Sequence, residues 1–145
     1  MGVVLISLLL GMNSAVDQPV SRLNFVPGQV WRYHTRAQDL GSSLTILKID
    51  PPEEGVPQII HIRVENVRMR MPWTSKDKLT TLEHLPIQRD ALESSVSALL
   101  ETRDPPPLPP DYDEWQASGG SAYATPVADS VDFIEQHLIQ YTATP

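Results

Sequence analysis

The chain has 145 residues and a mass of 16.2 kDa, which suits one domain with a core of its own. It contains no cysteine, which excludes disulfides, thiolate catalysis, zinc ribbons and iron–sulfur clusters. The formal net charge is −7, with nine Lys/Arg and seven Asp/Glu in residues 1–79 but two and eleven in residues 80–145. Because phosphate backbones would meet net repulsion, nucleic acid is not expected as a ligand. The acidic half is expected to face the basic half or a cationic partner.

An apolar run at residues 3–10, VVLISLLL, opens the chain. The run is too short to span a bilayer, so no transmembrane segment is predicted. Two interpretations are open. If residues 1–15 are a cleaved signal peptide, the protein is periplasmic or secreted; if the start codon is mis-chosen or the run is an ordinary buried segment, it is cytoplasmic. We assign residues 1–24 to a leader and linker, and residues 25–145 to a single domain.

Three strands are predicted next, at residues 29–36, 44–49 and 58–71. The segments between them, 38–42 and 50–55, are rich in Asp, Gly, Pro and Ser, which favours turns. Short connections between consecutive strands are typical of an antiparallel, strongly bent sheet.

The third of these segments has the clearest pattern in the chain. Its apolar residues alternate with polar ones, as in a strand with one wet face, and the two sets are Ile60, Ile62 and Val64 against His61, Arg63 and Glu65. After Asn66 the phase shifts by one residue, and the apolar positions become Val67, Met69 and Met71. A bulge or sharp bend near Asn66 is therefore predicted.

The second half of the chain is predicted to be mainly helical. Residues 73–84 are polar and irregular, and a helix is predicted over residues 88–102 from the spacing of Leu92, Val96, Leu99 and Leu100. Residues 104–111 contain five prolines and predict an extended connector. A short helix at 112–118, stopped by two glycines, and a final helix capped by Thr125 complete the series. The fold class is thus α+β, with a bent antiparallel sheet of three or more strands packed against two to three helices.

Catalytic and metal-binding patterns do not stand out. The four histidines lack the spacing of a metal site, and neither a nucleophile elbow nor a phosphate-binding glycine loop is present. No catalytic residue, metal or cofactor is therefore predicted. His34 and His61 are expected on wet faces of adjacent strands, where they can become neighbours.

A stripe of arginines is the strongest candidate for a binding site. Arg63, Arg68 and Arg70 lie on one predicted strand, and neighbouring strands add Arg32, Arg36 and Lys48. Two interpretations are open: the acidic second half covers this cationic face, or the face is open and holds an acidic protein partner.

Several segments read in order resemble an uncharacterised family of small bacterial proteins, over about residues 25–139. They are GQVWRYHTR, SLTILKID, IIHIRVENVRM, HLPIQRDALESSVSALLE, DEWQ and TPVADSVDFIEQHL. The resemblance implies a succession of three strands, a helix, a Trp-containing segment and a final helix. It implies no activity, cofactor or catalytic residue.

These observations favour a non-enzymatic protein-binding or accessory domain that uses the Arg-rich face. Its aromatic anchors would come from Trp31, Tyr33, Trp73 and Trp115. A bacterial immunity-type protein is one alternative of this kind. The other alternative is a small hydrolase or ligand-binding enzyme with a site built from His34, His61 and the arginines.

Overall fold

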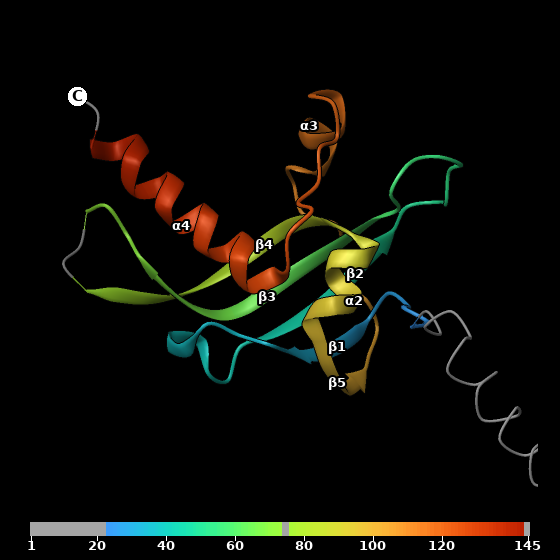
Figure 1. Ribbon diagram of the computed structural model, residues 1–145, viewed down its shortest axis with the longest axis horizontal. Helices are drawn as coiled ribbons and strands as arrows, with labels where there is room; N and C mark the ends of the chain where they lie inside the picture. Colours follow the sequence, from blue (N-terminus) through green and yellow to red (C-terminus); the bar gives the residue numbers. More distant parts are fainter. Residues whose placement is uncertain (1–22, 74–75, 144–145) are drawn as a thin grey trace, which may run out of the picture.

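A computed structural model describes residues 23–73 and 76–143, and it shows an α+β domain with one five-stranded antiparallel sheet (Figure 1). The predicted fold class is confirmed. The predicted leader lies outside the described residues except for positions 23 and 24. The strands are ordered β4-β3-β2-β1-β5 across the sheet. Along the chain the elements are β1 (Gln29–Tyr33), η1 (Ala37–Asp39), β2 (Ser43–Ile49), β3 (Ile59–Arg70), β4 (Asp77–Gln88), α2 (Arg89–Ser95), β5 (Val96–Thr102), α3 (Tyr112–Ala117) and α4 (Val127–Ala143).

Strand β3 has the alternation and the break that the sequence predicts. Five of its apolar side chains, on both sides of the break, are fully buried: Ile60, Ile62, Val64, Val67 and Met69. Asn66 has a positive φ of 59°, and the register with β4 shifts between Val64 and Val67. Because of the bulge, the apolar side chains of both halves of the strand point into the same core.

Two predictions about the second half of the chain are wrong. The segment 73–84, predicted to be irregular, contains most of β4, which forms a long hairpin with β3. The predicted helix 88–102 is the helix α2 followed by the edge strand β5. At Val96 the backbone becomes extended, and β5 pairs with β1 so that Leu99 lies opposite Trp31. The open edge of β1 supplies the hydrogen-bond partners that decide between helix and strand here.

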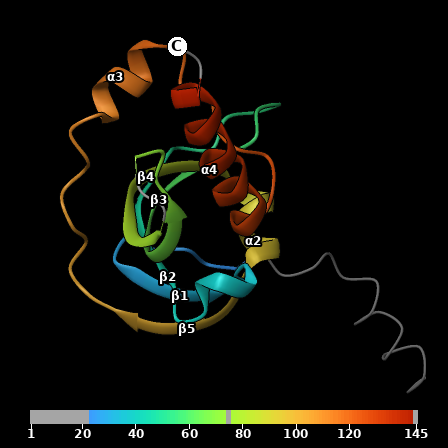
Figure 2. The same cartoon turned by 90° about the vertical axis from the view of Figure 1, so that its left-hand side faces the viewer.

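The main core lies between one face of the sheet and the helices α2 and α4. Helix α4 crosses over the strands on this face (Figures 1 and 2). Its first N–H, at Val127, donates to Ser95 Oγ on α2 at 2.9 Å, so the cap comes from α2 and not from Thr125 as predicted. The principal core residues besides those of β3 are Trp31, Tyr33, Leu44, Ile46, Leu85, Ile87, Ala91, Leu92, Val127 and Val131.

The opposite face of the sheet is covered by α3 and the segment that leads to it. Residues 103–111, neither helix nor strand as predicted, run from β5 around the sheet to α3 (Figure 2). We call this segment the proline strap. It is anchored at Gly28, where the N–H of Arg103 donates to the Gly28 carbonyl at 3.0 Å. A Cβ at Gly28 would lie 1.9 Å from the Arg103 oxygen, so only glycine fits there.

Among the described residues, the helices are all too short or too polar to cross a membrane.

The positive φ at Asn66 gives a test of the bulge. Asn66→Val should lower the free energy of unfolding by about 1–3 kcal/mol, because a β-branched residue is strained in this conformation. Asn66→Gly should retain stability close to wild type, since glycine adopts positive φ readily. Urea denaturation of the three proteins measures the difference. Equal stability of the Val and Gly variants would contradict the proposed constraint.

Candidate functional site

The arginines of β3 point away from the main core, but they differ in how they are paired. Arg63 is partly buried, with Nε 3.1 Å from Glu83 Oε2 and Nη1 3.7 Å from Glu65 Oε1. Arg68 and Arg70 are exposed, as is Arg32 on β1. The structure thus neutralises Arg63 locally and leaves the others facing solvent.

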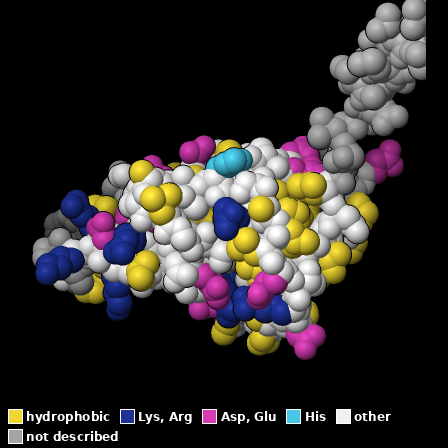
Figure 3. Space-filling model, turned by 90° about the horizontal axis from the view of Figure 1, so that it is seen from below, with side chains coloured by type: hydrophobic (Ala, Val, Ile, Leu, Met, Phe, Trp, Pro, Cys, Tyr) yellow, Lys and Arg dark blue, Asp and Glu magenta, His cyan; other side chains and the backbone are white. Residues whose placement is uncertain are grey.

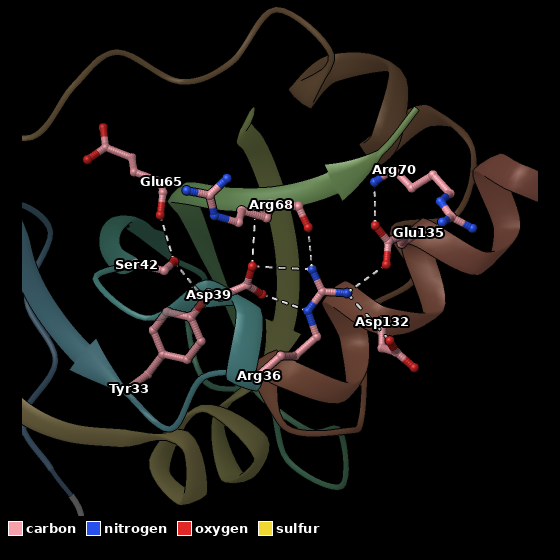
Figure 4. A network of polar contacts seen from close by, with 9 residues as sticks. All are labelled: Tyr33, Arg36, Asp39, Ser42, Glu65, Arg68, Arg70, Asp132 and Glu135. Atoms are coloured by element: carbon pink, nitrogen blue, oxygen red, sulfur yellow. Dashed lines mark hydrogen bonds and ion pairs between the residues drawn. The ribbon is translucent and has the colours of Figure 1, made fainter. Parts of the chain in front are cut away.

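Arg36 does not lie on this face, and its predicted place there is wrong. Its side chain is only 8% exposed and is enclosed by η1, β3 and α4 (Figure 4). Nε lies 2.6 Å from Asp39 Oδ2, Nη1 lies 2.9 Å from Glu135 Oε1 and 3.4 Å from Asp132 Oδ1, and Nη2 donates to the Arg68 carbonyl at 2.8 Å. Burial acts to lower the pKa of Arg36, but Asp39 and Glu135 outweigh it and raise the pKa. Arg36 therefore ties β3 to α4.

The same carboxylates bind the backbone of β3 rather than its side chains. Asp39 Oδ1 accepts from the N–H of Arg68 at 2.8 Å, and Glu135 Oε2 accepts from the N–H of Arg70 at 2.5 Å. In Figure 4 the dashed lines from these acids lead to backbone atoms of Arg68 and Arg70 and to the guanidinium of Arg36, and none leads to the guanidinium of Arg68 or Arg70. Within the part of the chain that the structure describes, no ion pair joins the guanidinium of Arg68 or Arg70 to a carboxylate.

The predicted neighbours His34 and His61 are not brought together. His34 is exposed just after β1, whereas His61 on β3 is fully buried. The prediction that His61 faces water is wrong, because α3 covers this part of the sheet. Two further predicted anchors, Trp31 and Tyr33, are buried in the core and offer no surface to a partner, while Trp73 is 74% exposed.

His61 instead belongs to a hydrogen-bonded series that we call the histidine chain. Its Nε2 lies 2.9 Å from Asp50 Oδ1, and its Nδ1 lies 2.9 Å from His84 Nε2. Nδ1 of His84 lies 3.4 Å from Asp111 Oδ1. The side chains of both histidines are almost inaccessible, at 0% and 2%. Two imidazoles thus connect a carboxylate on the β2–β3 loop to one at the start of α3.

Two aromatic side chains of α3 cover the histidine chain. The ring centroids of Tyr112 and Trp115 lie 5.0 and 4.7 Å from that of His61, both with edge-to-face geometry. Trp115, predicted as a binding residue, is half-buried, and its Nε1 donates to the Ser121 carbonyl at 2.7 Å. Lys48 Nζ lies 3.1 Å from Asp50 and over the ring of Tyr112 at 5.3 Å, so it belongs to this cluster rather than to an open cationic face.

The proton positions follow from the first member of the chain. Burial lowers the pKa of His61, although the neighbouring Asp50 acts in the opposite direction. Since an ionised carboxylate only accepts, neutral His61 donates through Nε2 and accepts at Nδ1 from the Nε2–H of His84. Nδ1 of His84 faces Asp111.

Hollows lie on both sides of α3, one at each end of the histidine chain. One of about 380 Å³ is bordered by Lys48, Asp50 and Tyr112. The other, of about 460 Å³, lies between α3, β4 and α4, and we call it the α3–α4 groove. Its lining residues are His84, Pro86, Asp111, Trp115, Ser121, Ala122, Tyr123, Phe133 and Ile134.

Sequence reasoning missed Asp50, His84 and Tyr112 as members of a cluster. The signal was available for His84, because it stands in alternation with Leu85 and Ile87, but residues 73–84 were not recognised as strand. In the described residues the structure contains no group of three or more His, Asp or Glu side chains with metal-binding geometry.

Comparison with family models, with curated proteins and with solved structures gives no match. The resemblance to an uncharacterised bacterial family therefore stays a prediction.

The Arg36 network predicts a large effect on stability. Arg36→Ala should lower the free energy of unfolding by about 3–5 kcal/mol, because it leaves Asp39 buried without its cation. Arg32→Ala, which removes an exposed arginine from β1, is the matched control and should change it by about 0.5 kcal/mol or less. Chemical denaturation measures both. Similar losses in the two variants would show that Arg36 is not a special tie.

The buried His61 predicts a pH dependence of stability. Histidine in the unfolded chain has a pKa of about 6.5, and the pKa of His61 in the folded protein is lower. As the pH falls through about 6.5, the unfolded state therefore binds more protons than the folded state. The stability present at neutral pH should therefore decrease as the pH is lowered from about 7 toward the folded-state pKa. His61→Asn should flatten this slope, whereas His34→Asn, which removes an exposed histidine, should keep it. Denaturation at a series of pH values tests the sign, and a stability that rises on acidification would contradict it.

Proposed function

We propose that the chain is a non-enzymatic binding domain that holds an acidic protein partner through the arginines of β3. The support for this proposal is the set of hydrogen bonds that the nearest acids make. Asp39 and Glu135 bond to Arg36 and to the backbone N–H groups of Arg68 and Arg70, and not to the two exposed guanidinium groups. A planar guanidinium can bind a carboxylate through two parallel hydrogen bonds, which suits recognition of Asp and Glu side chains.

The surface around these two arginines carries charges of both signs. Figure 3 shows Lys and Arg side chains gathered at the end of the molecule formed by the β3–β4 hairpin. In the register with β4, Arg68 pairs with Leu79 and Arg70 with Asp77, whereas Lys78 pairs with Met69 and so lies on the other face of the hairpin. We define the hairpin face as Arg68 and Arg70. Arg63 and Arg32 lie farther from the hairpin end, and Arg63 has carboxylates of its own at hand.

The geometry favours this proposal over the hydrolase alternative in the form that the sequence suggested. That form needs His34 and His61 in one site with the arginines, whereas His61 is buried beneath α3 and His34 is exposed elsewhere. An accessory role of the immunity type is compatible with a charged binding face, and it remains part of the proposal.

The test is capture of partners from a native extract at low and high ionic strength. The wild-type protein should retain an acidic protein at low salt and lose it at high salt, since exposed charge pairs are screened. Arg68→Ala/Arg70→Ala should weaken that capture by roughly tenfold, since two exposed ion pairs contribute up to about 1 kcal/mol each.

A charge-matched control separates the face from the net charge. Gln116→Glu/Gln136→Glu lowers the net charge by the same amount at exposed positions of α3 and α4. This variant should capture the partner nearly as well as wild type. If the arginine variant keeps every captured protein, or if the control loses as much, the hairpin face is not the binding site.

A further inference from the structure

A carboxylate lies at the edge of the α3–α4 groove. Asp111 is one of the residues that line the groove, and its side chain is 60% exposed. Its Oδ1 lies 3.4 Å from Nδ1 of His84, whose side chain is only 2% exposed, so the carboxylate rather than the imidazole is open to a ligand. An ionised carboxylate accepts hydrogen bonds and donates none, so a ligand bound here has to bring the donors.

The walls of the groove are aromatic. Trp115 comes from α3, Tyr123 from the segment after it, and Phe133 from α4. The rings of Tyr123 and Phe133 have edge-to-face geometry with centroids 6.2 Å apart, and Phe133 is 58% exposed. A hollow that combines aromatic side chains with a few convergent polar groups is a usual form of a small-molecule site.

The charge of the groove selects the ligand class. Asp111 is the acid among its lining residues, its side chain is 60% exposed, and none of the nine lining residues is Lys or Arg. Burial raises the pKa of Tyr123, which keeps its phenol neutral. Aromatic faces and a carboxylate both attract cations, whereas an anion finds no positively charged side chain in the lining.

We propose that the α3–α4 groove binds a small organic cation, an ammonium group carried by an aromatic body, whose N–H groups donate to Asp111. The aromatic body lies against Trp115, Tyr123 and Phe133. This site is separate from the hairpin face, and it does not depend on the function proposed for that face.

Three probes of similar size test the ligand class: benzylamine, benzyl alcohol and benzoate. The intact protein, labelled with ¹⁵N, is titrated with each, and the indole N–H signal of Trp115 is followed by NMR. Benzylamine should bind at least about fivefold more tightly than benzyl alcohol, the scale of a partly exposed charge pair, and benzoate should not bind. Equal binding of the amine and the alcohol, or binding of benzoate, would overturn the proposal.

Two variants locate the site. Asp111→Asn should reduce the affinity for benzylamine to that for benzyl alcohol, whereas Asp113→Asn, which removes an exposed acid outside the groove lining, should leave it unchanged. Phe133→Ala should weaken the amine and the alcohol alike, since it removes a wall and no charge. If Asp113→Asn weakens benzylamine as much as Asp111→Asn does, the attraction is a general effect of the acidic surface and the site is refuted.

Discussion

The left-handed backbone at Asn66 is the constraint on which the rest of the structure depends. A strand of twelve residues with an unbroken alternation would turn one half of its apolar side chains toward water after the phase shift in its sequence. The single residue with positive φ absorbs that shift, so that Val64 and Val67 are both fully buried. The same correction directs Arg68 and Arg70 away from the main core and sets the path of the β3–β4 hairpin.

Arg36 connects this bent strand to α4. Its guanidinium joins three parts of the chain, since it contacts Asp39 on η1, the backbone of β3 and Glu135 on α4. The acidic second half of the chain does meet the basic first half, through the nearly buried Arg36 and through the pair of Arg63 with Glu83 rather than across a broad face. The side chains of Arg68 and Arg70 lie outside the Arg36 network, whereas their backbone N–H groups donate to its carboxylates.

The sequence was sufficient to predict the elements whose pattern of apolar, proline and glycine residues follows from their own local structure and burial. Alternation located β3 and its bulge, and prolines and glycines marked the proline strap and the end of α3. It failed for β5, because Val96, Leu99 and Leu100 have the spacing of a helix face, and the choice of strand depends on the free edge of β1. It failed for β4 because Asp77–Leu82 has little apolar content and is held by pairing with β3. The candidate sites depend on longer separations still, since Arg36 and Glu135 are 99 positions apart and His61 is covered by a helix that follows five prolines.

The proline strap also has a mechanical consequence. A flexible linker would let α3 move relative to the histidine chain without changing the position of the sheet, because such a linker has many end-to-end distances open to it. A polyproline segment has little slack, and this one is fastened to β1 at Gly28 immediately before it leaves the sheet. The place that α3 takes over the histidine chain is thus set in part by the point at which the strap leaves β5.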